Sequence, residues 1–193
     1  MMSRFASSAD ELSKERSAPV ARTPLDARSF DALFRECAPD VHAYAISLLG
    51  DRAAAEDVTA LAFERLYRSR ARLDLARGTP RAWLFSIARN AALDELRRRR
   101  RRPQHELDER LPVAGAAGEE LERIARRATV HAALAALPIR ERELVLLKFH
   151  GQLSNGELAR ALGISESNAG TRLHRALTRL REHCSELDRQ EVA

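Results

Sequence analysis

The sequence predicts an all-α fold with two small helical domains joined by a flexible linker. Hydrophobic residues make up 45% of the 193 residues, which is enough to form buried cores, whereas aromatic residues make up only 5%. Glycine and proline number 8 and 7, and the abundant alanine, leucine, arginine and glutamate favour helices over sheets. We expect an N-terminal domain of three-helix type and a four-helix C-terminal domain that contains a helix-turn-helix.

The overall charge narrows the range of partners. The formal net charge is +5 and the pI is about 10.0, which favours a polyanion such as nucleic acid or an anionic membrane surface. No apolar run approaches the roughly 20 residues of a membrane-spanning helix, and residues 1–28 lack the apolar stretch of a secretory signal. These observations predict a cytoplasmic protein without membrane insertion.

The residues that commonly carry catalysis or bind metals are scattered. Cys37 and Cys184 lie far apart, and the sequence has no cysteine–histidine cluster with zinc spacing, so we interpret both as reduced thiols. We find no nucleophile–base pair and no phosphate-binding loop in the sequence. The sequence therefore predicts no metal, no cofactor and no enzyme.

The N-terminal end divides into a polar arm and a first helix. Residues 1–28 are polar and without periodicity, which is typical of a disordered arm. A helix is predicted from Ser29 to Leu49, where apolar residues recur three and four positions apart. Pro39 interrupts this pattern, so we expect a kink or two short helices. Gly50 then follows as a C-terminal cap.

Two further helices complete the first domain. One is predicted from about Arg52 to Arg70. After the loop Asp74–Thr79, a third helix starts at Pro80, because Thr79 can cap it and proline loses no hydrogen bond at the first helical position. This third helix continues into six consecutive arginines, Arg97–Arg102.

A linker separates the two domains. Residues 103–118 contain proline, glycine and alanine without periodicity, so we place the first domain at 29–102, the second at 119–186 and a tail at 187–193. The second domain is predicted as four helices, over 119–136, 138–151, 154–162 and 165 to about 184. In the first of these helices the pattern places five residues inward: Leu121, Ile124, Ala128, Ala132 and Ala135.

The last two of these helices form the strongest motif. Ser154 with Glu157 fits a capping box, Gly163 permits a tight turn, and Ser165 caps the next helix. Helix, short turn and helix is the geometry of a DNA-binding helix-turn-helix, whose second helix enters the major groove. The outward residues that could meet bases or phosphates are Ser165, Glu166, Ser167, Asn168, Thr171, Arg172, His174 and Arg175. The alternative is a helical hairpin with a solvated basic face.

The segment Leu73–Arg102 carries a second signal. Trp83 and Phe85 stand beside a basic helix, and aromatic side chains of this kind suit the exposed faces of unstacked, single-stranded bases. The arginines suit phosphates. The alternative is that Trp83 is a core residue and that the arginines form a solvated tail.

Three segments occur in order along the chain and match one family. They read Ala55-Glu56-Asp57-Val58 with Phe63-Glu64-Arg65-Leu66-Tyr67, then Pro80-Arg81-Ala82-Trp83-Leu84-Phe85-Ser86-Ile87-Ala88-Arg89-Asn90 with Asp94 and Arg97-Arg98, and then Leu137-Pro138 with Arg142, Leu146-Leu147 and Arg172-Leu173-His174-Arg175-Ala176. Together they resemble the extracytoplasmic-function (ECF) sigma factors, members of the sigma-70 family of bacterial RNA polymerase initiation factors. The resemblance covers about Ser29 to Glu182.

The resemblance implies partners and a role for each segment. The partners would be core RNA polymerase, promoter DNA and an anti-sigma factor. The residues that would bind polymerase are Glu56, Asp57, Phe63 and Arg65. Those that would bind the promoter −10 region, which they help to open, are Asp74, Gly78, Trp83, Asn90, Arg97 and Arg98. The outward residues of the helix-turn-helix would bind the −35 region.

Some positions depart from the family pattern. Ala60 stands where a glutamine is usual, Leu61 where a polar or acidic residue is usual, and Asn155-Gly156 replaces an aromatic–acidic pair. Gly170 stands in the recognition helix where a basic residue is common, and an interior glycine costs about 1 kcal/mol relative to alanine. Two other functions remain open. A stand-alone regulator would use the same helix-turn-helix without polymerase, and Ala60 and Gly170 motivate a non-initiating decoy for an anti-sigma factor.

Overall fold

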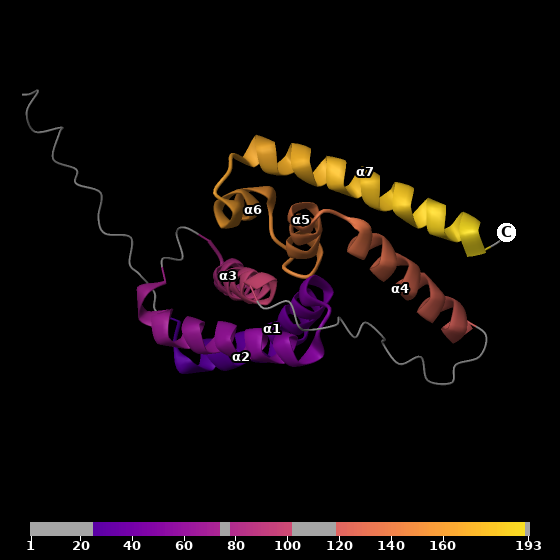
Figure 1. The fold of residues 1–193 in the computed structure, drawn as a ribbon. Coiled ribbons are helices and arrows are strands. Elements are labelled where there is room, and N and C mark those ends of the chain that lie inside the picture. The colour runs from indigo at the N-terminus through magenta and orange to yellow at the C-terminus, as the bar shows by residue number, and fades with distance from the viewer. Residues whose placement is uncertain (1–24, 74–77, 102–118, 192–193) are drawn as a thin grey trace, which may run out of the picture.

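The computed structural model describes residues 25–73, 78–101 and 119–191, and within these ranges every regular element is helical. This confirms the predicted fold class. We refer to α1–α3 as the N-terminal domain and to α4–α7 as the C-terminal domain (Figure 1). The elements are α1 (Ala27–Leu49), α2 (Arg52–Ser69), the 3₁₀ turn η1 (Arg70–Arg72), α3 (Pro80–Arg101), α4 (Glu119–Ala136), α5 (Ile139–Phe149), α6 (Asn155–Leu162) and α7 (Glu166–Glu191).

Short polar side chains set the ends of the first helices. Asp26 caps α1 by accepting a hydrogen bond from the Ser29 amide at 2.7 Å, and Asp51 caps α2 by accepting one from the Ala54 amide at 2.9 Å. Gly50 ends α1 in the left-handed conformation, at φ 65°, as predicted. Pro39 lies inside one continuous helix, so the alternative of two short helices is wrong.

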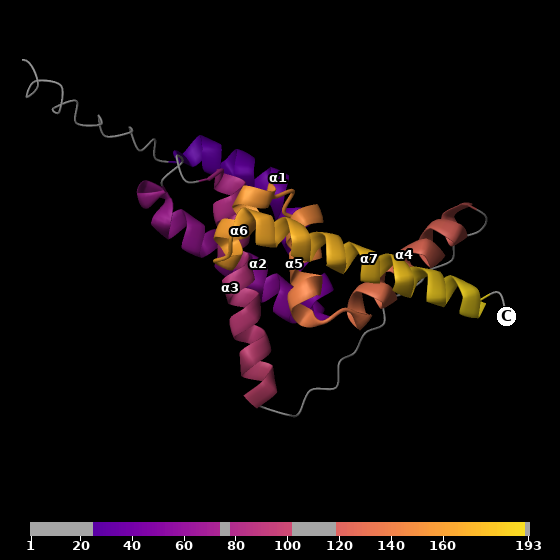
Figure 2. The ribbon, with the colours of Figure 1, turned by 90° about the horizontal axis from the view of Figure 1, so that it is seen from above.

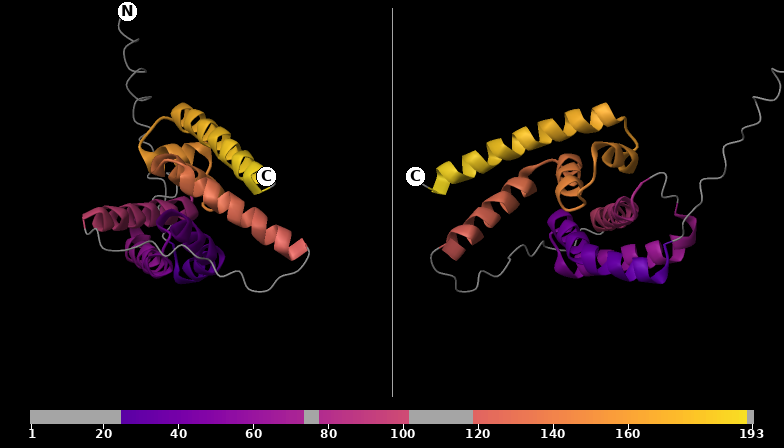
Figure 3. Two further views of the ribbon diagram at one scale, coloured as in Figure 1. Left: turned by 45° about the vertical axis from the view of Figure 1, so that its right-hand side comes forward. Right: turned by 180° about the vertical axis from the view of Figure 1, so that it is seen from behind.

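Three aliphatic and aromatic faces form the core of the N-terminal domain. α1 and α2 lie side by side, and α3 lies between this pair and the C-terminal domain (Figures 1 and 3). Tyr44 of α1 and Phe85 of α3 are fully buried, with their rings edge to face and their centroids 5.9 Å apart. Leu66 of α2 and Leu84 of α3 are also fully buried, and each such side chain contributes about 1.5–3 kcal/mol to folding.

The C-terminal domain is built around its last helix. α7 packs on α4, α5 and α6 (Figures 1 and 3). α7 continues past the predicted end at Cys184 to Glu191. The reason is that the apolar stripe of the helix continues, since Leu180, Cys184 and Leu187 are all half-buried.

The inward face of α4 differs from the prediction over the part of the helix whose side chains the structure describes; Leu121 and Ile124, also predicted inward, lie outside that part. Ala128, Ala132 and Ala135 are exposed, whereas the buried residues are Ala133, Leu134 and Leu137, the last of these just after the helix. A helix rich in alanine offers similar small side chains on several faces. Leucine removes more apolar surface from water than alanine does, so Leu134 and Leu137 determine which face turns inward.

The two domains also pack against each other. α5 contacts α1, α6 contacts α3, and buried residues of both domains belong to one continuous apolar cluster. Within the part of the chain that the structure describes, none of the helices is long and apolar enough to cross a membrane.

Candidate nucleic-acid interfaces

The turn between α6 and α7 has the geometry that its sequence predicts. Ser154 and Glu157 form both bonds of the capping box: the Glu157 amide donates to Ser154 Oγ at 3.2 Å and the Ser154 amide donates to Glu157 Oε2 at 2.9 Å. Gly163 ends α6 in the left-handed conformation, at φ 66°. Ser165 then accepts a hydrogen bond from the Asn168 amide at 3.3 Å and so caps α7.

The first turns of α7 present one polar face to solvent. Ala169, Leu173 and Ala176 are buried against the rest of the domain. Of the residues predicted to meet the −35 region, Asn168 is half-buried and all the others are exposed: Ser165, Glu166, Ser167, Thr171, Arg172, His174 and Arg175. These side chains therefore form one continuous surface on a single helix, which we call the α7 face.

Gly170 lies on α7 and is one of the residues that depart from the family pattern. It is half-buried, and a Cβ atom built on it would lie 3.7 Å from Asn155 Nδ2 at the start of α6. This is an ordinary van der Waals distance, so packing does not require glycine at this position.

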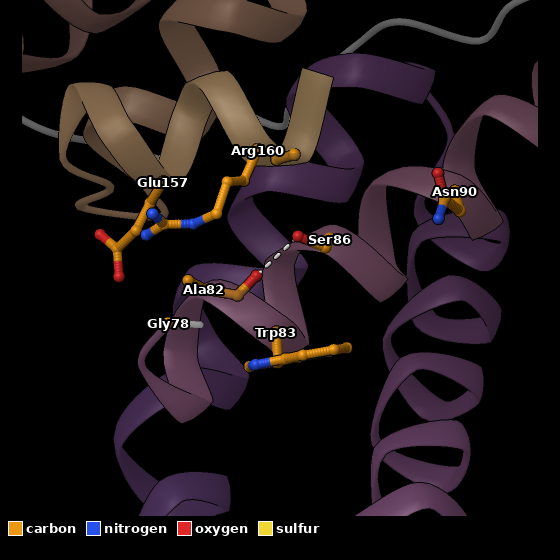
Figure 4. Close-up of a pocket in the computed structure, with 8 residues that line it drawn as sticks. Gly78, Ala82, Trp83, Ser86, Asn90, Glu157 and Arg160 are labelled. Atoms are coloured by element: carbon orange, nitrogen blue, oxygen red, sulfur yellow. Dashed lines mark hydrogen bonds between the residues drawn. The ribbon is translucent and has the colours of Figure 1, made fainter. Parts of the chain in front are cut away.

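A second candidate surface lies on α3. Thr79 caps this helix through a hydrogen bond from the Ala82 amide at 3.2 Å, as predicted. Three residues predicted to meet the −10 region, Gly78, Trp83 and Asn90, line one cavity of about 400 Å³ (Figure 4). We call these three residues the α3 face, of which Trp83 and Asn90 lie on α3 and Gly78 just before it. Asp74, predicted to act with them, lies outside the described residues.

The opposite wall of that cavity belongs to the C-terminal domain. Glu157, Arg160 and Ala161 of α6 line it, and Figure 4 shows the Glu157 and Arg160 side chains extending from α6 toward α3. Trp83 is half-buried. Asn90 is exposed, so α6 covers the α3 face only in part, on the side of Gly78 and Trp83.

The arginines at the end of α3 are not equivalent. Arg97 and Arg98 are exposed and pair with Asp94 and Glu95 of the same helix, at 2.7 and 2.8 Å. They lie near the end of α3 that extends clear of the C-terminal domain (Figure 2).

Arg99, in contrast, is only 19% exposed. It binds Glu95 at 2.9 Å, Asp51 at 2.8 Å and the Leu49 carbonyl at 3.2 Å. Arg99 thus anchors α3 to the turn between α1 and α2, which the sequence analysis did not predict. Partial burial raises the pKa of Glu95, but hydrogen bonds from Arg98 and Arg99 outweigh it, and the pKa is lowered overall.

Of the four residues predicted to bind polymerase, three are polar and exposed, and the fourth is a buried aromatic residue. Glu56, Asp57 and Arg65 are exposed on α2, and Glu56 pairs with Arg52 at 3.0 Å. Phe63 is only 4% exposed. Its ring lies edge to face with that of Phe34, at a centroid distance of 4.7 Å.

Phe63 is therefore a core residue, and the exposed aromatic side chains on this side of the domain are Phe34 and Tyr67. Phe34 is 47% exposed and Tyr67 is 43% exposed, and the Arg70 guanidinium lies 3.8 Å from the centroid of the Tyr67 ring. These two aromatic residues carry the apolar surface beside the polar residues of α2.

The sequence analysis missed the polar residues between the two domains. Arg89 of α3 and Glu143 of α5 form an ion pair at 2.5 Å, with side chains 18% and 5% exposed. Burial raises the pKa of Glu143, and the Arg89 guanidinium opposes this only in part. One signal was available: Glu143 directly precedes the buried run Leu144–Leu147, so a charge at that position requires a partner.

Two family descriptions match the chain. Sigma-70 region 2 matches residues 33–102, and Sigma-70, region 4 matches residues 127–180. The first match covers most of the N-terminal domain and contains the α3 face. The second contains the helix-turn-helix and the α7 face.

The chain is also similar to individual sigma factors. The ECF RNA polymerase sigma factor SigL of Mycobacterium tuberculosis is 32% identical over 157 residues, which cover 81% of this chain and 89% of the relative. The RNA polymerase sigma factor CarQ of Myxococcus xanthus is 33% identical over 162 residues, covering 83% and 91%. The ECF RNA polymerase sigma factor RpoE of Cereibacter sphaeroides is 28% identical, covering 85% and 91%.

Two solved structures share the fold. The sigma factor RpoE, in complex with the anti-sigma factor NepR from Bartonella quintana, gives a TM-score of 0.67 at 23% identity and covers 82% of this chain and 98% of that chain. CnrH, in complex with the cytosolic domain of CnrY, gives a TM-score of 0.61 at 24% identity, covering 84% and 90%.

Proposed function

The chain belongs to the ECF sigma factors of the sigma-70 family, and we propose from this premise a division of labour between its two domains. In this proposal α7 reads the −35 duplex, while α3 holds bases of the −10 region after they have left the stack. Exposed residues of α2 bind core RNA polymerase. The observation that carries the proposal is the α7 face, because a capped recognition helix with a continuous polar surface follows directly after a short first helix and a glycine turn.

Contacts from α7 would both position the protein on the −35 duplex and read the base sequence of that duplex. Residues in its first turns, such as Ser167 and Thr171, can reach base edges. Arg172 directly follows Thr171 and Arg175 lies about one turn further along, and both suit either a guanine edge or phosphates. The family commonly has a basic residue at the position of Gly170, so this chain forms one contact fewer there.

Contacts from α3 would suit single-stranded DNA. Trp83 offers a flat apolar ring on which a base can stack, and Asn90 offers an amide that can both donate and accept hydrogen bonds. Arg97 and Arg98 lie further along the same helix and can track the phosphates. No step in this proposal forms or breaks a covalent bond, since bond formation belongs to the polymerase. We therefore infer a non-enzymatic role in the cytoplasm, where the polymerase acts.

The length of the linker is compatible with this division of labour. The −35 and −10 regions lie more than one helical turn of DNA apart, which is about 35 Å. Residues 103–118 can span at most about 55 Å when extended. One chain can therefore bind both regions if its domains separate.

An anti-sigma factor is the second partner that we propose. RpoE was solved with the anti-sigma factor NepR, and CnrH with the cytosolic domain of CnrY. This chain shares their fold over more than four fifths of its length. A protein of this kind would hold the chain away from polymerase until a signal releases it.

A run-off transcription assay tests the proposed function. Purified protein and core RNA polymerase are combined on a template that carries the DNA upstream of the protein's own coding sequence. Specific transcripts that depend on the protein support initiation. Duplex binding without any association with polymerase would favour a stand-alone regulator. Association with an anti-sigma factor without transcripts would favour a decoy, for which Ala60 and Gly170 are the motivating departures.

Removing the linker gives a second test. A variant that lacks most of residues 103–118 should retain both folded domains, measured by circular dichroism, but should lose run-off transcription. Normal transcription from the shortened protein would contradict the division between a −35 domain and a −10 domain.

A further inference from the structure

Two residues from different helices meet where α6 packs on α7 (Figure 1). Asn155 is the first residue of α6, and Gly170 lies in the second turn of α7. The side-chain nitrogen Nδ2 of Asn155 lies 3.7 Å from the point at which a Cβ atom of residue 170 would stand. The amide group of α6 therefore lies beside the place where α7 has no side chain.

This place belongs to the α7 face. Residues three and four positions apart lie on the same side of a helix, so Gly170 shares its side of α7 with Ser167 and His174. Both of these residues are exposed, and so is Asn155. A side chain of α6 thus adjoins the surface that the sequence analysis assigned to α7 alone.

The amide of Asn155 is available for binding. Its neighbours Ser154 and Glu157 bond to each other in the capping box, at 2.9 and 3.2 Å. Over the ranges that the structure describes, no hydrogen bond joins the side chain of Asn155 to another residue. A side-chain amide offers two N–H donors and a carbonyl acceptor, and here all of them remain free for an outside partner.

Gly156 contributes to the same arrangement. A Cβ atom built on Gly156 would lie 3.5 Å from Oε2 of Glu166, so the Glu166 carboxylate lies beside the start of α6. An acidic residue, which is usual in the family at position 156, would place a second carboxylate next to it, and like charges repel. Asn155, Gly156 and Gly170 all depart from the family pattern, and they lie together at one junction.

We propose that Asn155 contacts a base of the −35 region in place of the side chain that Gly170 lacks, and that it is a specificity-determining residue. This inference rests on the proposed function, because it concerns the same α7 face. A basic side chain at position 170 would suit a guanine edge or a phosphate, whereas an asparagine amide matches the N6 and N7 atoms of adenine. We therefore expect a preference for adenine at the base that Asn155 meets.

The contact is neutral, which gives it a signature of its own. A cation that neutralises a phosphate adds about one unit to the slope of log affinity against log salt. The Asn155 amide carries no charge. Its removal should therefore change the base preference of the protein and leave the salt slope unchanged.

The experiment uses the full-length protein bound to core RNA polymerase and a pool of duplexes with random sequence. Bound duplexes are sequenced, which gives the base preference at each position. We expect Asn155→Ala to lower the preference at one position of the −35 region about tenfold and to leave the other positions unchanged. Gly156→Ala is the matched control, because it alters the next residue of α6 but its methyl group faces Glu166, and it should keep every preference.

A second variant restores a basic residue on α7. A Cβ atom at position 170 makes only an ordinary contact, so Gly170→Arg should fold, and its longer side chain would take the place of the Asn155 amide. We expect the salt slope to rise by about one unit. In the Gly170→Arg protein, the added change Asn155→Ala should alter base preference by less than about twofold, since residues that share a contact are not additive.

Thermal unfolding guards against a trivial explanation. Asn155 is exposed, so Asn155→Ala should unfold at nearly the same temperature as the unaltered protein. If that variant does not fold, Asn155→Ser takes its place. The serine side chain is shorter by the amide group, so the same loss of base preference is expected.

Three results would overturn the inference. Asn155→Ala could retain every base preference, it could weaken binding equally on all sequences, or its effect could be the same with and without Gly170→Arg. The second result would assign Asn155 to a phosphate.

Failure of the proposed function is a separate outcome. In that case the unaltered protein with core polymerase would enrich no sequence and yield no transcripts, and the inference would fall with it. Enrichment of a −35 sequence that does not depend on Asn155 would overturn the inference alone.

Discussion

The α7 face and the α3 face differ in both composition and surroundings. The α7 face is polar throughout, whereas the α3 face includes the aromatic ring of Trp83, although each lies on a helix that also carries a buried side. The α7 face is solvent-exposed, whereas the α3 face shares a cavity with α6 of the other domain. A residue that points away from its own helix is therefore not always exposed to solvent. Contacts between distant segments of the chain determine which of these residues are exposed.

The difference follows from where each helix lies. The first turns of α7 lie at the outside of the C-terminal domain and are buried along one side only, at Ala169, Leu173 and Ala176. α3 lies between the α1–α2 pair on one side and α6 on the other (Figure 3). Its buried residues occur around more of its circumference than those of α7 do: Ala82, Leu84, Phe85, Ala88, Ala91 and Ala92. A helix between two layers has less free surface than one at the edge.

The largest effect is expected from Phe85→Ala. Phe85 is fully buried, stacks edge to face on Tyr44 and approaches Gly151 across the domain contact. Truncation should lower the free energy of unfolding by about 3–5 kcal/mol and loosen the contact between the domains. Urea denaturation measures the loss. A loss near 1 kcal/mol would mean that α3 is not central to the packing, and the contrast between the two helices would fail.

Trp83→Ala should act on strand binding more than on stability. The side chain is half-buried at the edge of the cavity, so its removal should lower unfolding stability by less than Phe85→Ala does. Loss of one stacked base should weaken binding of a bubble template by about 1–3 kcal/mol. Binding of intact duplex serves as the control. A stability loss as large as that of Phe85→Ala, with no selective loss on the bubble, would show that Trp83 is only a core residue.

Arg172→Ala tests the α7 face. Arg172 is exposed, so folding should not change, while binding to a −35 duplex should weaken by about 1–3 kcal/mol if the guanidinium contacts a base with two hydrogen bonds. Arg179→Ala, further along α7 and paired with Glu141, is the matched control. An equal loss on every DNA sequence would reassign Arg172 to phosphate contact.

The sequence predicted the local structure of this molecule better than its long-range contacts. The capping box at Ser154 and the glycine turn at Gly163 were predicted correctly, because their bonds join residues a few positions apart. Glu143, which pairs with Arg89, and Asp51, which is one partner of Arg99, lie far away in the sequence, so periodicity carries no information about these pairs. The face of α4 was predicted wrongly for a related reason, since alanine fits either side of a helix.

We expect the arginines at the end of α3 to have two different roles: Arg99 anchors the helix, and Arg97 contacts DNA. Arg99→Ala should lower the free energy of unfolding by about 1–2 kcal/mol, because Arg99 loses charged hydrogen bonds to Asp51 and Glu95. Arg97→Ala should change stability by less than about 0.5 kcal/mol, since Arg97 is exposed.

The dependence of DNA binding on salt separates the same two residues. Arg97→Ala should lower the slope of log affinity against log salt by about one unit if Arg97 contacts a phosphate, whereas Arg99→Ala should leave it unchanged. Equal slopes in both variants would remove the distinction between an anchoring and a DNA-binding arginine.

A small effect of the opposite sign is expected at Gly170 on the α7 face. Gly170 lies inside a helix and has room for a Cβ atom, so Gly170→Ala should raise the free energy of unfolding by about 0.5–1 kcal/mol, as the unfolded chain loses conformational freedom. Gly163 provides the opposing control. A Cβ atom there meets nothing within 4 Å, but its φ of 66° is one that L-residues rarely adopt, so Gly163→Ala should destabilise the domain.

Thermal unfolding of both alanine variants shows whether packing or backbone conformation determines the need for glycine at each position. If Gly170→Ala were destabilising, the contact between α7 and Asn155 at the start of α6 would have to be tighter than the 3.7 Å approach indicates. The glycine would then be needed to position the recognition helix. If the variant is stabilised and binds the −35 duplex as before, glycine is needed neither for the fold nor for the contact with DNA, and the α7 face owes its availability to its place at the edge of the molecule.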